Sequence, residues 1–87
     1  SARTQQTVKE IVNEYKIGSD SITGIFSPTI THVKLIVDGV IERQSKVTDG
    51  KFAIYAKDKV TSPTQKVEIA GYIGTAKEVI RKSVSIK

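Results

Sequence analysis

Alternation of apolar and polar side chains, interrupted by turn residues, constrains the fold of this chain more than any other feature. The stretch 32–37 reads His-Val-Lys-Leu-Ile-Val, so that three of its apolar side chains share one face of an extended segment. Asp38-Gly39 follows at once, and a second such pair, Asp49-Gly50, precedes the alternating stretch 51–56. Asp-Gly between alternating segments is typical of hairpin loops, because both central residues of a type I′ turn need positive φ. The pattern therefore predicts antiparallel hairpins.

Other parts of the chain also favour strands. Residues 21–26, 65–72 and the segment after Gly74-Thr75 alternate in the same way, and the Pro-containing stretch 61–64 has the composition of a loop. Along the last segment Lys82 falls on the same face of an extended strand as Ile80, Val84 and Ile86. A charged residue among inward-facing apolar ones indicates a bulge or an edge position near Lys82. About seven strands at a spacing of roughly 8–12 residues predict an all-β fold, a small antiparallel sandwich or barrel.

The N-terminal stretch 7–16 is compatible with two structures. Its apolar residues fall at the spacing of a helix, which would put them on one helical face. The same stretch is rich in β-branched residues and leads directly into a strand pattern. We expect a strand, because one short helix would have little to dock on in so small a chain.

Length and composition restrict the class of protein. The chain has 87 residues, enough for one domain. It has no Cys, which excludes disulfides and thiolate metal sites, and no apolar run approaches the ~20 residues of a membrane span. It also has no Met, so we expect it to be a fragment of a larger protein. We expect residues 1–6 to be a linker or a remnant of cloning, and residues 7–87 to be the domain.

Residues suited to catalysis are scarce. His32 is the single His, and no Gly-x-Ser-x-Gly elbow or Gly-rich phosphate cradle accompanies it. Asp20, Asp38, Asp49 and Asp58 fall in predicted turns, where carboxylates from different loops could converge on calcium. Asp is nevertheless the expected turn residue, since it tolerates positive φ. We therefore expect a plain surface His32, no cofactor, no metal and no enzymatic activity.

The net charge of +5 comes entirely from residues 51–87, which carry eight Lys and Arg against three acids. Such asymmetry can indicate an anionic partner, although an ordinary solvated surface explains it equally well. Tyr55 and Tyr72 are predicted surface rings beside Lys57 and Lys66, where bases could stack. We expect nucleic acid not to be a partner, because cross-strand packing also favours Tyr on an outer face. The candidate residues for contact with an anionic polymer are Lys57, Lys59, Lys66, Arg81 and Lys82.

Several motifs in order resemble one family. They are Ile17-Gly18-Ser19-Asp20-Ser21-Ile22-Thr23-Gly24, then the strand and turn from Val33 to Gly39, the stretch from Val47 to Ala56, Asp58-Lys59-Val60, Val67 to Tyr72, and Lys82 to Ile86. This order is similar to that of bacterial immunoglobulin-like modules, which recur in tandem in surface and secreted proteins of Gram-positive bacteria. The resemblance covers residues 7–87 and implies an immunoglobulin-like antiparallel β-sandwich of about seven strands without catalytic residues. Residues 7–16 and the Pro28 segment, Ser27–Thr31, depart from the usual pattern.

The residues and the resemblance together lead to two functional expectations. The first is a non-catalytic structural spacer or adhesion module of a bacterial cell-surface or secreted protein, in an extracellular or cell-wall location. Its partners would be neighbouring domains of the parent chain, and a cell-wall polymer or a host surface ligand. A sandwich with its termini at opposite ends would let joined copies form a rod. The alternative is a binding module for an anionic or carbohydrate cell-wall polymer.

Overall fold

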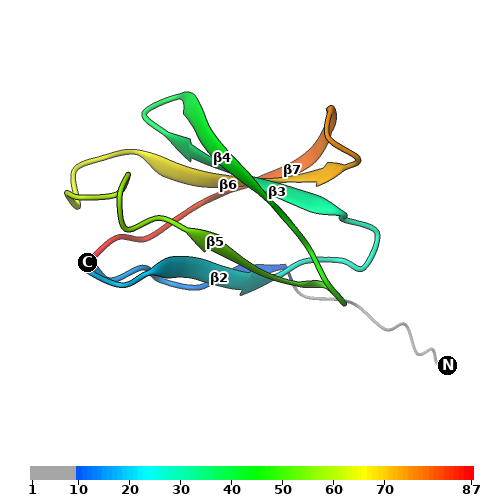
Figure 1. Ribbon diagram of the computed structural model, residues 1–87, viewed down its shortest axis with the longest axis horizontal. Helices are drawn as coiled ribbons and strands as arrows, with labels where there is room; N and C mark the ends of the chain where they lie inside the picture. Colours follow the sequence, from blue (N-terminus) through cyan, green and yellow to red (C-terminus); the bar gives the residue numbers. More distant parts are fainter. Residues whose placement is uncertain (1–9) are drawn as a thin grey trace, which may run out of the picture.

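Two antiparallel sheets pack face to face in the computed structural model, which describes residues 10–87 (Figure 1). One sheet has three strands in the order β1-β2-β5, and the other has four in the order β4-β3-β6-β7. The strands are β1 (Ile11–Val12), β2 (Ser21–Ile25), β3 (His32–Val37), β4 (Val40–Lys46), β5 (Lys51–Tyr55), β6 (Val67–Ile73) and β7 (Lys77–Ser83). The predicted all-β, immunoglobulin-like sandwich of seven strands is confirmed.

Both Asp-Gly pairs form the predicted turns. Asp38 and Gly39 have φ values of 51° and 84°, and they join β3 to β4 as a two-residue loop. Asp49 and Gly50 have φ values of 52° and 77° and lie between Thr48 and Lys51, which form a β-bridge. These four positive φ values are those that a type I′ turn requires. The first pair therefore forms the predicted hairpin between β3 and β4, whereas the second forms only a local turn, because β4 and β5 belong to different sheets.

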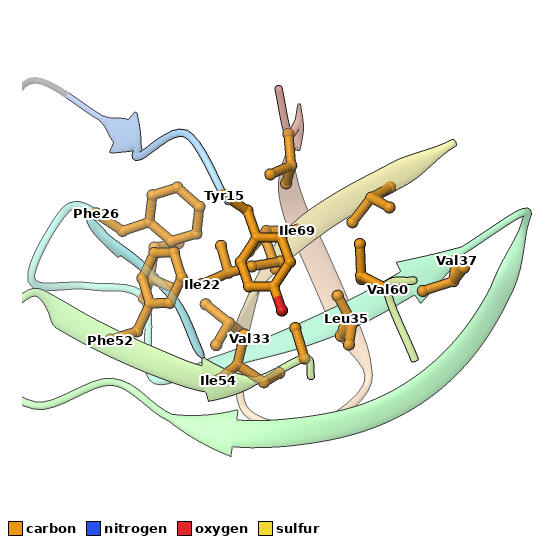
Figure 2. Packing of buried hydrophobic residues seen from close by; sticks show 14 residues of the cluster. Tyr15, Ile22, Phe26, Val33, Leu35, Val37, Phe52, Ile54, Val60 and Ile69 are labelled. Carbon is orange, nitrogen blue, oxygen red and sulfur yellow. The ribbon is translucent and has the colours of Figure 1, made fainter. Parts of the chain in front are cut away.

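The core lies between the two sheets and is lined by the alternating apolar residues. At one end of the core Phe26 and Phe52 are in contact, with ring centroids 5.1 Å apart, and Figure 2 shows Val37 and Val60 at the other end. Every second residue of β5 points inward, as the alternation predicts. The members of this cluster are Tyr15, Ile22, Phe26, Ile30, Val33, Leu35, Val37, Phe52, Ile54, Ala56, Val60, Val67, Ile69 and Val84.

The N-terminal segment is extended and contributes to both sheets. β1 pairs with β2, with Ile11 opposite Ile25. Three residues after β1, Tyr15 forms a parallel bridge with Ile86, which follows the last strand of the other sheet. The prediction of a strand is thus confirmed within residues 10–16, although β1 itself is only two residues long. Residues 7–9 of that predicted strand lie outside the described residues.

The Pro28 segment and β7 show the departures that the sequence indicated. Between β2 and β3 the chain makes a turn in which the Ile30 N–H donates to the Ser27 carbonyl, and the Ile30 side chain is buried in the core. β7 is an edge strand that pairs only with β6, and its pairing shifts at Gly71/Tyr72, opposite Val79. The edge position expected for Lys82 is therefore confirmed, with the irregularity a few residues before it.

The two ends of the described chain lie at opposite ends of the sandwich. Glu10 precedes the pair of Ile11 with Ile25, at the end where β2 finishes. Lys87 is hydrogen-bonded to Tyr15 and Ile17, close to the turn that enters β2. In Figure 1 the C-terminus accordingly lies at the left, beside the start of β2, whereas the arrowhead of β2 points to the right.

Candidate functional site

Three of the five basic candidate residues are held in ion pairs with acids of this chain. Lys57 Nζ lies 4.0 Å from an Asp20 carboxylate oxygen, and Lys59 Nζ lies 3.5 Å from Glu42. Arg81 lies 2.7 Å from Glu78 and 3.5 Å from Glu68. These three cations are thus partly neutralised within the domain.

The five basic residues are also spread over different parts of the sandwich. Lys57 and Lys59 follow β5 of the three-stranded sheet. Lys66 immediately precedes β6, and Arg81 and Lys82 belong to β7. Successive residues of a strand point to opposite faces, so Arg81 and Lys82 face opposite ways. Lys82 is half-buried opposite Ile69, a core residue. The fold does not gather these five side chains on one face, and the proposed polymer contact stays a prediction.

His32 and the four turn aspartates occupy separate environments. The His32 ring is half-buried and its Nδ1 lies 2.9 Å from the Thr31 hydroxyl. Asp38 and Asp49 are the first central residues of the two tight turns and have positive φ, while Asp20 and Asp58 pair with cations. Within residues 10–87 no three His, Asp or Glu side chains gather closely enough to hold a metal ion, and this part of the chain encloses no pocket.

Tyr72 corrects one prediction, because it is not an exposed ring beside Lys66. Its side chain points to the outer face of the four-stranded sheet but is only 6% exposed. The ammonium group of Lys34 lies 4.2 Å from its ring centroid and also donates to the Thr75 carbonyl. The Tyr72 hydroxyl donates to Glu78 Oε1 at 3.3 Å. Burial, together with the charge of Glu78, raises the pKa of Tyr72.

Arg81 and Glu78 form a forked, charge-assisted contact on this outer face. The Arg81 Nε and Nη2 atoms donate to the two oxygens of Glu78, at 3.0 and 2.7 Å. This forked contact is the main reason that the pKa of Glu78 is lowered. Beside it lies a second small apolar cluster, formed by Ile36, Ala70 and Tyr72. The charged side chains cover apolar surface here with their stems and keep their charged groups toward solvent.

This arrangement could not be predicted from sequence spacing. Residues three apart in a regular strand point to opposite faces, so the spacing of Glu78 and Arg81 does not predict a contact between them. The shift in pairing between β6 and β7 places Glu78 opposite Tyr72 and Arg81 opposite Ala70, both on the outer face. The irregularity in β7 is what brings the two charges together.

Tyr55 is 42% exposed, as predicted, but its cationic neighbour is Arg43. The guanidinium carbon of Arg43 lies 5.2 Å from the Tyr55 ring centroid, and its Nη2 atom donates to Asp58 at 2.8 Å. Arg43 belongs to β4 and Tyr55 to β5, which are not hydrogen-bonded as neighbours. The side chain of Arg43 therefore bridges the open side of the sandwich, linking one sheet to the other.

Comparison with protein families gives a match over nearly the whole chain. The model of the family described as "Bacterial Ig domain (Big_16)" matches residues 7–87. Comparisons with curated proteins and with solved structures gave no significant match. Across the described residues there is no helix long and apolar enough to cross a membrane. Modules of this family are typically non-catalytic and are common in surface proteins. The family model covers nearly the whole chain, and the fold has the two stacked antiparallel sheets that the resemblance implied, seven strands in all. The chain therefore belongs to the bacterial Ig domain family.

Proposed function

We propose that this chain is a structural spacer or adhesion module of a bacterial cell-surface or secreted protein, in an extracellular or cell-wall location. Residues 7–87 would form the module, and residues 1–6 a linker or a remnant of cloning. Its immediate partners would be the neighbouring domains of the parent chain. In such a role the module acts through its shape, because it holds the preceding and following segments a fixed distance apart.

The observation that carries this proposal is the position of the two chain ends. Glu10 and Lys87 lie at opposite ends of the sandwich, so a copy joined at each end would extend the molecule along its length. Lys87 is hydrogen-bonded to the domain through its own N–H and carbonyl. A segment that follows it therefore starts from a fixed point. Short connections between such modules favour a rod over a flexible string.

Small-angle X-ray scattering of proteins with one, two and three joined copies tests this proposal. We expect the maximum dimension to rise by a constant increment with each copy, as it does for a rod. A matched protein with a long Gly/Ser linker between copies should give a smaller and less regular increment, because that linker behaves as a flexible coil. A maximum dimension that hardly grows from one copy to three would contradict the spacer role.

The basic charge of residues 51–87 supports a second candidate, a binding module for an anionic or carbohydrate cell-wall polymer. Purified cell wall would retain such a module in a salt-dependent manner. Replacement of Lys57, Lys59, Lys66, Arg81 and Lys82 by Gln should then abolish retention. Retention that is unchanged by these substitutions would remove the argument from charge. Arg81→Gln alone is a useful control, because it also breaks the contact with Glu78 and reports any loss of folding.

A further inference from the structure

The two hairpins of the four-stranded sheet present their tips at opposite ends of the sandwich (Figure 1). Residues 38–41, at the turn from β3 to β4, form the exit tip, on the side of the C-terminus. Residues 73–77, at the turn from β6 to β7, form the entry tip, on the side where β2 ends. Every residue of both tips is exposed. A module joined at either end of the chain would lie beside one of these tips.

Both tips carry large apolar side chains that are open to solvent. Val40 and Ile41 of the exit tip are 56% and 52% exposed, the highest values among the exposed large apolar residues of the described chain. Ile73 of the entry tip is 42% exposed, and Ala76 in the same tip is exposed as well. Removal of apolar surface from water is favourable in proportion to its area. Each tip therefore presents surface that contact with a partner would stabilise.

The charges of the two tips are of opposite sign. The exit tip contains Asp38, whereas the entry tip contains Lys77. Among residues 10–87 neither of these side chains takes part in an ion pair. Two exit tips, or two entry tips, would place like charges together, whereas an exit tip against an entry tip pairs opposite charges. Charge thus favours contact between the exit end of one copy and the entry end of another.

Hydrogen bonds to the rest of the domain hold both tips in place. The Asp38 N–H donates to the Lys66 carbonyl at 2.8 Å, and the Lys66 N–H donates to Asp38 Oδ1 at 2.9 Å. In the entry tip the Thr75 carbonyl accepts from Lys34 Nζ at 2.8 Å. A contact surface that is already ordered loses less conformational freedom on binding. The two tips are therefore suited to meet without rearrangement.

We infer that the exit tip of one copy docks on the entry tip of the following copy in a chain of joined modules. This inference rests on the proposed spacer function, because it needs a copy joined after the C-terminal end. The contact involves two different surfaces, so it repeats from copy to copy without closing. The tips have only four and five residues, far fewer than the roughly 20–30 residues a side of a stable interface. The docking therefore depends on the high effective concentration that a covalent link provides.

Pulsed electron paramagnetic resonance on two full chains joined from Lys87 to Ser1 tests the docking, and the absence of Cys makes site-specific labelling simple. Spin labels on Lys66→Cys of the first copy and Thr29→Cys of the second lie near the two tips without belonging to them. We expect one narrow population at short distance, which shrinks as salt is added. In the matched control the two labels exchange copies and lie at the free ends of the joined protein. That protein should give no population at short distance.

The same substitution placed in either copy separates the contact from any effect on folding. Val40→Ser in the first copy removes an apolar side chain from the docked exit tip. We expect the ratio of docked to undocked molecules to fall about fivefold, as expected for the partial burial of one Val side chain. Val40→Ser in the second copy changes a tip that faces no neighbour, and it should leave the ratio unchanged.

A second pair of variants tests the charges. Asp38→Asn in the first copy removes the charge and keeps an oxygen that accepts from the Lys66 N–H. It should lower the ratio of docked to undocked molecules about twofold, the size expected for one exposed ion pair. Lys77→Gln in the second copy should lower the ratio by the same factor. The two substitutions together should lower it no further than either alone, because both remove the same pair.

A broad distance distribution for the joined copies would overturn the docking. So would equal effects of Val40→Ser in the first and second copies, since that result describes a change in the module and not in a contact between modules. Neither result depends on the maximum dimension measured by X-ray scattering. A maximum dimension that grows regularly with copy number, together with a broad distribution of label distances, would retain the spacer function and remove the docking.

Discussion

At the scale of single residues, Gly24 shows how closely β1 approaches the rest of the sandwich. A Cβ atom built on Gly24 would lie 2.3 Å from the Ile11 carbonyl oxygen and 2.7 Å from the Phe52 ring. Neither neighbour can easily move, because the first is backbone and the second is a core side chain. The absence of a side chain at position 24 is therefore what allows the N-terminal strand to pair with β2.

Gly24→Ala should accordingly destabilise the domain by about 1–3 kcal/mol, the usual range for an overpacked interior. Equilibrium unfolding in urea measures this as a lower midpoint at an unchanged slope. Thr23→Ser, next to it on the exposed face, keeps the hydroxyl that accepts from Asn13 Nδ2. It is the matched control and should cost no more than about 0.5 kcal/mol. Equal losses for the two variants would show that β1 does not pack against Gly24 as described.

The contact between Glu78 and Arg81 predicts a dependence of stability on pH. Because the pKa of Glu78 in the folded protein lies below its ordinary value, the contact stabilises the fold above that value and is lost as the pH falls through the folded pKa. Glu78→Gln should lower the urea midpoint at pH 7, and the difference from the wild type should shrink below about pH 4. Arg81→Gln removes the other partner of this contact, so it should lower the urea midpoint with the same dependence on pH. A difference that stays constant with pH would contradict the role of the carboxylate.

At the scale of elements, the turns and the inward faces of β3, β5 and β6 could be predicted from the sequence because they depend on local chemistry. Asp-Gly specifies its own φ values, and alternation specifies which side chains face the core. The position of Tyr72 could not be predicted, since its burial depends on Lys34 and on an irregularity in β7. The bridge from Tyr15 to Ile86 was also missed, because it joins residues from opposite ends of the sequence.

The glycines of the two Asp-Gly turns, Gly39 and Gly50, provide a comparison between similar turns. Both have positive φ, so Ala at either position is strained. A Cβ on Gly39 would meet no atom within 4 Å, whereas one on Gly50 would lie 2.8 Å from the Phe26 carbonyl oxygen. We expect Gly39→Ala to cost about 1–2 kcal/mol and Gly50→Ala to cost more, as measured by thermal or urea unfolding. The reverse order would contradict the packing of the Asp49-Gly50 turn against the residue that follows β2.

At the scale of the whole molecule, the account depends on how the chain enters and leaves the sandwich. The N-terminal strand pairs first with one sheet and then with the last segment of the other, so it runs along the length of the domain. This path places Glu10 and Lys87 at opposite ends, and it also brings residues 15–17 beside residues 85–87. This feature of the topology supports the spacer function.

The distance between the two ends is the most direct test of this arrangement. Spin labels on Glu10→Cys and Lys87→Cys should be separated by about 20 Å or more. Lys87 is bonded to the residues on either side of Lys16, which lies six residues beyond Glu10 along an extended segment. Labels on Lys16→Cys and Lys87→Cys should lie close enough to broaden the continuous-wave spectrum by dipolar coupling. Similar short distances for both pairs would place the two ends together and would contradict the spacer function.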